Sequence, residues 1–367
     1  MARPLSVERA EVSAYTVPTD APEADGTFTW TETTMVLVRI WADGQVGTGW
    51  TYGSVATATL IRQTLAPMLI GRPVTDIGRI WPDLRIALRN IGYPGIGSMA
   101  VSATDCALWD LKARVLGLPL HRLLGAVRDA VPIYGSGGFT SYDDEQLAAQ
   151  LAGWVHDDHL TRVKIKIGEA WGTDQDRDLA RVRQARDGVG DQGELYVDAI
   201  AGYTVAQAVR MSYALDTLDV TWFEEPVSSD DLAGLRRVRE GCQADVTAGE
   251  YGYSLDYFAR MAEAGAVDCL QVDATRCGGI SELLRITPLA AAHHLDISGH
   301  CAPYQHLAVL AAVPNLRHLE WFHDHVRIEQ LFFDGADPPR DSALHPPESV
   351  GNGLTWRPDA ASPFQVF

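Results

Sequence analysis

The sequence is short of cysteine, and its few cysteines are not arranged in pairs. There are five of them and no CxxC motif, so neither a disulfide framework nor a zinc site of the usual spacing is expected. We expect reduced, buried thiols in a cytoplasmic protein. The five residues are Cys106, Cys242, Cys269, Cys277 and Cys301.

Long apolar runs and excess positive charge are also missing. No stretch approaches the length of a membrane span, and residues 1–12 lack the apolar core of a signal peptide, so we expect no membrane partner. Lys and Arg number 30 against 48 Asp and Glu, a formal net charge of -18, which argues against nucleic acid as a partner. A small anionic substrate is compatible with this balance, because local charge decides its binding.

The first third of the sequence has the pattern of an antiparallel sheet followed by helices. Residues 6–17 and 34–52 alternate as strands do, and Asp43-Gly44 is a typical hairpin turn. Residues 19–30 are polar and predict a surface loop with Phe28 and Trp30 near its tip. Helical periodicity follows the strands, so residues 1–126 predict an α+β capping domain.

From residue 131 onward, strands and helices alternate. The apolar runs recur roughly every 20 to 32 residues, as in the strand–helix units of a parallel barrel, and each ends in a polar residue. We expect an α/β fold: a (β/α)7β TIM-like barrel over residues 127–330, with the final helix replaced by irregular chain. Residues 331–367 are rich in proline and are expected to be extended and to pack on the cap.

Three successive strands each end in a single carboxylate, namely Asp198, Glu224 and Glu250. The carboxyl ends of barrel strands meet at one mouth, so these side chains are expected to converge there. Hard oxygen ligands of this kind suit Mg2+. One such acid alone would be an ordinary solvated residue, but three in successive units favour one bound Mg2+. Glu225 points to the other side of its strand and is expected to have a supporting role.

The other predicted barrel strands also carry polar residues at their ends: two lysines, an Asp/His pair and a final glutamate. Lys164 and Lys166 face the same way, so one can neutralise a substrate carboxylate while the other, if largely neutral, acts as a base. Asp273 and His300 end later strands, where the carboxylate would fix the tautomer of a second acid/base. We expect Glu320 to be protonated and to donate a hydrogen bond to an enolate oxygen.

These groups suit the removal of a proton alpha to a carboxylate. The product of that step is a dianionic enediolate, whose charge a divalent metal, a lysine and a proton-donating glutamate can each stabilise. Bases on both faces permit either return of the proton to the opposite face or departure of a beta hydroxyl.

The chain resembles the mandelate racemase subgroup of the enolase superfamily. The resemblance covers essentially the whole chain and rests on ATDCALWDLKARVLGLPLHRLLG, the K-x-K strand, WFEEP, AGE, QVDATRCGG and the late His and Glu. It implies a cap, a (β/α)7β barrel, one Mg2+ on the three carboxylates above, and a homo-oligomer. It further implies Lys166 as one base, Asp273–His300 as the other, Lys164 on the substrate carboxylate and Glu320 as electrophile.

Two features bear on the substrate. Muconate-cycloisomerase-like members carry a lysine on the sixth strand, which here reads DCLQVDATRCGG, so the His–Asp version is favoured. Many relatives have Asp-x-Asn where this chain has Asp198-Ala199-Ile200, and the Ile200 side chain cannot form a hydrogen bond. The substrate of a relative therefore cannot be assigned to this chain. The residues expected to contact the substrate are Ile200, Phe28, Trp30, His323 and His325. An ordinary solvated or structural loop is the favoured alternative for the two histidines, and packing on the cap is the alternative for Phe28 and Trp30.

We expect dehydration of an acid sugar to a 2-keto-3-deoxy acid, with His300 protonating the leaving hydroxyl. The alternatives are racemisation or epimerisation of a 2-hydroxy acid, cycloisomerisation or syn-elimination on the lysine face, and a non-catalytic barrel that binds carboxylates. The segment 19–30 is expected to cover the mouth and to carry much of the specificity.

Overall fold

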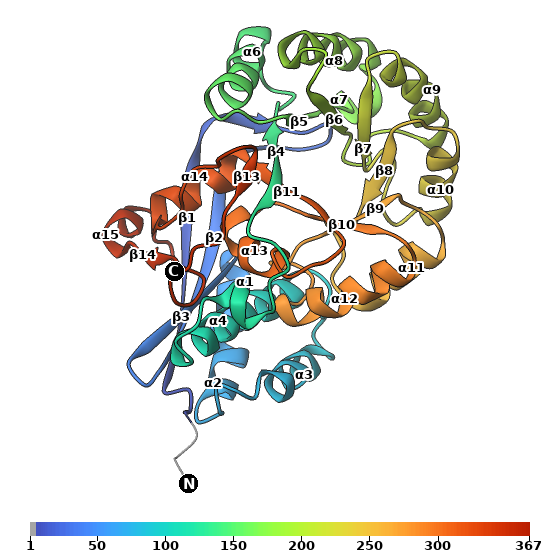
Figure 1. Ribbon diagram of the computed structural model, residues 1–367. Coiled ribbons are helices and arrows are strands. Elements are labelled where there is room, and N and C mark those ends of the chain that lie inside the picture. Colours follow the sequence, from blue (N-terminus) through green and yellow to red (C-terminus); the bar gives the residue numbers. More distant parts are fainter. Residues whose placement is uncertain (1–4) are drawn as a thin grey trace.

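The computed structural model describes residues 5–367 and shows an antiparallel cap, in blue, beside a barrel coloured from green to red (Figure 1). The cap sheet has the order β1-β2-β3, and its hairpin turns at Asp43 and Gly44 with φ of 51° and 72°, as a two-residue turn requires. Helix α4 packs across β3. The main cap elements are β1 (Arg9–Ala24), β2 (Thr29–Ala42), β3 (Gln45–Tyr52), α1 (Val55–Leu60), α2 (Ala66–Leu69), α3 (Ile77–Leu88) and α4 (Ile96–Val115).

The segment expected to be a surface loop, residues 19–30, is largely strand, so that prediction is wrong. The pairing of β1 with β2 is interrupted between Pro18 and Glu23 and then resumes up to a turn at residues 25–28. Two prolines are tolerated here because β1 is an edge strand with an irregular register. The resulting β1–β2 arm, residues 18–32, contacts the barrel, where Thr140 N–H donates to Ala24 O (2.8 Å).

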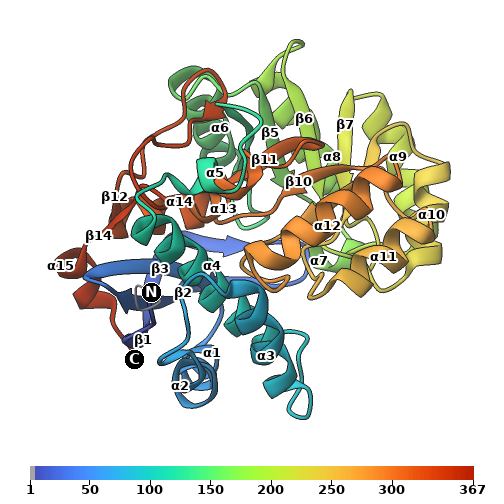
Figure 2. The same ribbon diagram turned by 60° about the horizontal axis from the view of Figure 1, so that its bottom comes forward.

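Eight parallel strands form the barrel, of which β5, β6, β7, β10 and β11 are labelled in Figure 2. The barrel closes where β11 pairs with β4 (Figure 1). The strands are β4 (Val131–Gly137), β5 (Arg162–Lys166), β6 (Glu194–Asp198), β7 (Val220–Glu224), β8 (Asp245–Ala248), β9 (Cys269–Val272), β10 (Asp296–Gly299) and β11 (Leu316–Phe322). The helices between them are α6 (Asp144–Ala152), α8 (Gln175–Val189), α9 (Val205–Asp216), α10 (Leu232–Glu240), α11 (Leu255–Glu263), α12 (Ile280–Ala292) and α13 (Pro303–Leu310), as expected from the sequence.

An eighth helix, α14 (His323–Phe332), follows the last strand, where irregular chain was expected. Its buried His325, Ile328, Glu329 and Phe332 recur at helical spacing, and the glycine and prolines that suggested a loop come after Phe332. The helix lies between the barrel and the cap, because Trp50 Nε1 of β3 donates to Glu329 of α14 (2.8 Å).

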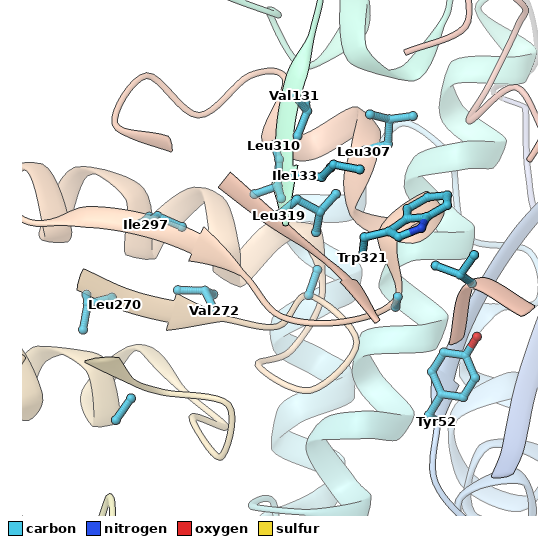
Figure 3. Packing of buried hydrophobic residues seen from close by; sticks show 14 of the residues in the cluster. Tyr52, Val131, Ile133, Leu270, Val272, Ile297, Leu307, Leu310, Leu319 and Trp321 are labelled. Carbon is cyan, nitrogen blue, oxygen red and sulfur yellow. The ribbon is translucent and has the colours of Figure 1, made fainter. Parts of the chain in front are cut away.

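Alternation along the strands divides the barrel into an apolar outer layer and a polar inner one. Outward residues such as Ile133, Leu319 and Val272 pack under the helices (Figure 3). Inward residues of β4, β6, β7 and β11 form an aromatic floor, and the next inward residue of each strand, two positions on, lies nearer the mouth. The floor consists of Tyr134, Tyr196, Trp222 and His318.

The C-terminal segment 331–367 contacts both parts of the molecule. Strand β13 (Ala343–Leu344) pairs with β4 of the barrel, and Ala14 of β1 exchanges hydrogen bonds with Val366 and Phe367. The division of the chain at residues 126 and 330 stays a proposal. None of the helices within residues 5–367 has the length and apolarity needed to span a bilayer.

Candidate active site

The polar residues that end the strands lie side by side at the mouth. In the sheet register Lys166 is paired with Asp198, and Asp198 with Glu224. They lie one inward position above the aromatic floor, because Tyr196 and Trp222 precede the two acids by two residues. Because alternate residues of a strand face inward, the aromatic–x–acid pattern in the sequence places a layer of charged side chains above the aromatic floor.

Three carboxylates of this layer form a compact set. Oxygen atoms of Asp198, Glu224 and Glu250 all lie within 4.8 Å of one another, and all three residues are buried. Each carboxylate is also held by a donor outside the set: Asp198 Oδ1 by Ile200 N–H (3.0 Å), Glu224 Oε2 by Trp222 Nε1 (2.9 Å) and Glu250 Oε1 by Arg276 Nη1 (3.2 Å). The remaining oxygen of each carboxylate pairs with a basic group at the mouth, namely Lys166, Lys164 or His300.

The electrostatics of this set fit a hard divalent cation. Burial raises the pKa of Glu224 to about 7, although Lys164 opposes the shift. Burial would also raise the pKa of Glu250, but His300 and Arg276 outweigh it and lower the pKa well below its ordinary value. Three clustered carboxylates in a space poor in water require positive charge, and all-oxygen donors are those that Mg2+ prefers.

Both lysines of β5 pair with these acids. Lys164 Nζ lies 2.5 Å from Glu224 Oε1 and 2.8 Å from Glu320 Oε1, and Lys166 Nζ lies 2.5 Å from Asp198 Oδ2. Burial would lower the pKa of each amine, but the carboxylates outweigh it and raise both pKa values. The expectation of a largely neutral Lys166 is therefore not met in this arrangement. Lys166 can accept a proton only after it has separated from Asp198.

His300 and Asp273 form the pair expected from the sequence. His300 Nδ1 lies 2.8 Å from Asp273 Oδ2, and Nε2 faces the carboxylate set, 3.2 Å from Glu250 Oε2. Burial opposes ionisation of this imidazole, but Cys301, Glu250 and Asp273 outweigh it and raise its pKa well above the ordinary value. The imidazole is thus protonated, which is the state that a general acid requires.

Glu320 lies at the mouth as expected, but its charge state differs from the prediction. Oε1 accepts hydrogen bonds from Ser136 Oγ (2.6 Å) and from Lys164, and Oε2 accepts one from Cys301 N–H (3.0 Å). Burial would raise the pKa of Glu320, but Lys164 and His300 outweigh it and lower the pKa. The expectation of a protonated carboxyl is wrong, because the groups around Glu320 are donors and cations rather than other acids.

A cavity of about 380 Å3 lies above this layer, between the barrel mouth and the cap. Lys166 and His300 line it from the barrel, and of the residues expected to contact the substrate, four also line it: Phe28, Trp30, Ile200 and His325. His323 is not among the lining residues. Its Nε2 lies 2.9 Å from Asp20 Oδ2 and ties the β1–β2 arm to α14 instead.

Two residues of the site escaped the sequence reasoning. Arg276 lines the cavity and lies 3.6 Å from Asp273 as well as contacting Glu250. Cys301 also lines the cavity, although the sequence places it among the inert thiols. Its position directly after His300 was the available signal, since residues at a barrel strand end face the mouth. All five cysteines are free thiols, as expected.

A parallel barrel closed by an antiparallel cap, with the acid–base groups at the joint between them, is the architecture of the enolase superfamily. Within it, the chain belongs to the mandelate racemase / muconate lactonizing enzyme family. Residues 9–125 match the N-terminal domain of that family, and residues 146–360 match the model described as enolase C-terminal domain-like.

Relatives within the family include both dehydratases and cycloisomerases. The chain is 33% identical over 301 residues to L-talarate/galactarate dehydratase of Salmonella typhimurium, covering 80% of this chain and 75% of the relative. It is 32% identical over 363 residues to D-galactarolactone cycloisomerase of Agrobacterium fabrum, covering 93% and 90%.

Solved structures of relatives share the whole fold. A mandelate racemase/muconate lactonizing enzyme-like protein from Rubrobacter xylanophilus superposes with a TM-score of 0.95 at 44% identity, covering 98% of this chain and 100% of that one. The Salmonella dehydratase, liganded with Mg and L-lyxarohydroxamate, superposes with a TM-score of 0.90 at 28% identity, covering 99% and 94%.

Proposed function

We propose that this protein is a Mg2+-dependent dehydratase that removes the proton alpha to the carboxylate of an acid sugar and eliminates the beta hydroxyl, giving a 2-keto-3-deoxy acid. Relatives named as dehydratases of talarate/galactarate, arabinonate and rhamnonate support this reaction. A cavity that joins two opposed proton-transfer groups to a set of carboxylates supports the chemistry.

The observation that carries the proposal is the placement of Lys166 and His300 on opposite sides of the mouth. Strand β5 is separated from β10 by four strands in one direction around the barrel and by β11 and β4 in the other. Both side chains line the same cavity. A substrate lying between them presents its alpha proton to the amine and its beta hydroxyl to the imidazole.

The chain's own residues then divide the work. Lys166 Nζ, once it has separated from Asp198 and released its own proton to solvent, takes the alpha proton. Lys164 stabilises the substrate carboxylate through its buried positive charge. His300 Nε2 gives its proton to the departing hydroxyl, which leaves as water. Asp273 on Nδ1 fixes the imidazole in place. Proton transfers of this kind contribute about 10² to 10⁴-fold each.

The metal and the last glutamate complete the site. Asp198, Glu224 and Glu250 would hold Mg2+, which when bound supplies Lewis-acid stabilisation of the charge that develops on the substrate carboxylate. Glu320, ionised, accepts hydrogen bonds from Ser136 and Lys164 and holds the buried Lys164 amine in place beneath the cavity.

Cycloisomerisation is the second candidate, because two cycloisomerases are about as similar to the chain as the dehydratases are. Racemisation or epimerisation also requires bases on both faces and uses the same pair. The reaction product distinguishes these candidates, whereas the first proton transfer is common to them.

The first experiment is a product assay with the Mg2+ form of the protein and a library of aldonates, aldarates and their lactones. The expected product is a 2-keto-3-deoxy acid from at least one acid sugar, and removal of the metal with a chelator is expected to abolish it. Formation of epimers without any keto acid would show that the reaction is epimerisation and not dehydration. Isomerisation of a lactone, with no reaction of any acid sugar, would show that the reaction is cycloisomerisation.

The second experiment assigns the two faces by exchange of the alpha proton in D2O. Lys166→Ala is expected to abolish exchange, whereas His300→Asn is expected to retain it and to slow dehydration by about 10² to 10⁴-fold. His293→Asn, on an exposed histidine after α12, is the control and should change neither rate. Unchanged exchange in both active-site variants would refute the roles assigned to Lys166 and His300.

We also propose a cytoplasmic homo-oligomer that binds a small carboxylate. The free thiols support a reducing compartment, since all five cysteines are unpaired. The oligomer rests on the family resemblance alone, and sedimentation velocity of the purified protein measures it; a single species at the 40.0 kDa chain mass would contradict it.

A further inference from the structure

A thiol, an imidazole and a carboxylate meet on the His300 side of the mouth. Cys301 Sγ lies 3.3 Å from His300 Nε2 and 3.3 Å from Glu320 Oε2, and these last two atoms are 3.7 Å apart. All three residues are buried, and His300 and Cys301 line the cavity. Of the cysteines in residues 5–367, Cys301 alone belongs to such a three-ligand group.

A strained turn places the thiol there. Cys301 and Ala302 have φ of 48° and 39°, a region that non-glycine residues rarely occupy. Two hydrogen bonds hold this turn, one from Cys301 N–H to Glu320 (3.0 Å) and one from Ala302 N–H to His325 Nδ1 (3.1 Å). Strain held in this way at a site is typical of a constrained function.

The three atoms are spaced as the ligands of a tetrahedral metal ion. Bonds of about 2.3 Å to sulfur and about 2.0–2.1 Å to nitrogen and oxygen place such ligands roughly 3.4–3.6 Å apart. The observed separations of 3.3, 3.3 and 3.7 Å differ from this by a few tenths of an ångström. Water can supply the fourth ligand, since Glu250, 3.2 Å from His300 Nε2, belongs to the carboxylate set.

We propose that His300, Cys301 and Glu320 form a second metal site, selective for Zn2+ and other thiophilic divalent ions. The carboxylate set offers only oxygen and favours Mg2+, whereas a thiolate and an imidazole favour softer ions. On binding, the Cys301 thiol and the His300 imidazole Nε2 each release a proton to solvent, and the thiolate and the freed nitrogen become ligands. If the proposed function holds, the bound ion removes the general acid, so Zn2+ inhibits the enzyme without displacing Mg2+.

The test uses Co2+ as a spectroscopic probe of the whole protein with Mg2+ in saturating excess. The wild type is expected to bind one Co2+ with a thiolate-to-metal charge-transfer absorption in the near ultraviolet, which Zn2+ abolishes by displacement. Cys301→Ser is expected to lack the absorption and to bind Zn2+ at least about 100-fold more weakly, the upper end of the loss caused by removing an outer-shell partner. Cys242→Ser, at a half-buried thiol outside the site, should retain both.

Inhibition gives a second readout, with each variant compared with its own rate without Zn2+. Zn2+ should inhibit the wild type and Cys242→Ser at concentrations that leave Cys301→Ser active. An absorption that persists in Cys301→Ser, or Zn2+ binding that rising Mg2+ abolishes, would overturn the proposal. Cys301→Ala replaces the serine variant if the latter fails to fold. The binding measurements use no substrate, so their outcome is independent of whether the proposed reaction is correct.

Discussion

Ile200 combines a strained backbone with a hydrogen bond to one of the three clustered carboxylates. Its φ of 41° is in the left-handed region, where a β-branched side chain is a genuine outlier, and Ala201 follows with a φ of 58°. In this conformation the Ile200 N–H donates to Asp198 Oδ1 and fixes the first carboxylate of the set. The side chain at the same time forms part of the cavity wall. The strain is thus retained at a position that serves the site.

Ile200→Asn is expected to stabilise the protein by about 1 kcal/mol, because asparagine tolerates the left-handed region at lower cost. Ile200→Val keeps the β-branch and loses a methylene group, so it should be less stable than the wild type by about 1 kcal/mol. Urea denaturation of the three proteins measures both differences. An asparagine variant less stable than the valine variant would show that the backbone is not strained.

At the scale of elements, the contact between β3 and α4 is set by two glycines of the strand. A Cβ on Gly47 would overlap the backbone at Ala107 and Leu111, and one on Gly49 would overlap the backbone at Ala103 and Ala107. The helix therefore lies against the bare strand backbone. Because β3 also carries Trp50 and Tyr52 toward α14, the position of α4 affects how the cap meets the barrel.

Gly49→Ala is expected to lower the free energy of unfolding by about 3 kcal/mol, because the new methyl group has no room and the helix must move. Gly78→Ala is the matched control: this residue is exposed near the start of α3, with no atom within 4 Å of the added Cβ. It should be neutral or stabilising by about 0.5 kcal/mol. Thermal unfolding compares the two, and equal effects would contradict the packing argument.

The sequence predicts the site better than it predicts the segments around it, for physical reasons. In a parallel barrel every strand end meets one mouth, so the position of Asp198 or His300 in the chain already fixes where it lies. The charge state of Glu320 was beyond such reasoning, because it depends on donors from β4, β5 and the turn at Cys301. The sequence pattern did not predict the β1–β2 arm, because its pairing resumes after a register shift that no local pattern indicates.

At the scale of the whole molecule, a buried glutamate joins the cap to the barrel. Glu329 of α14 accepts hydrogen bonds from Trp50 Nε1 (2.8 Å) and the Tyr52 hydroxyl (3.1 Å) of the cap, and from Tyr304 N–H (3.0 Å) of α13. Burial raises its pKa to about 8, although these hydrogen bonds oppose the shift. Ionisation of this carboxyl therefore costs stability because the charge is buried, even though the three hydrogen bonds that it accepts favour the ionised form.

The stability of the protein is expected to depend on pH through Glu329. Its pKa of about 8 in the folded state exceeds the ordinary 4.5, so the folded state holds the proton more tightly. The resulting stabilisation is full below about pH 4.5 and is lost as the pH rises through about 8, an effect on the order of a few kcal/mol. Glu329→Gln should remove this dependence.

Urea denaturation at about pH 5 and about pH 9 measures the difference between the wild type and Glu329→Gln. Glu263→Gln, on an exposed glutamate of α11, is the control and should keep the wild-type dependence. The same pH dependence in all three proteins would show that Glu329 is not the group responsible.

The hydrogen bonds between Ala14 and residues 366 and 367 have a consequence for protein synthesis. Domains at the start of a chain usually fold first as they leave the ribosome. Here one edge of β1 pairs with β2, but the other edge meets its partner only when residues 366 and 367 have been made, and β4 closes the barrel only when β11 has emerged. Ribosome-bound chains that end before β11 should therefore expose both unfinished edges to chaperones, and the active cavity should form only after β11 and α14 have emerged.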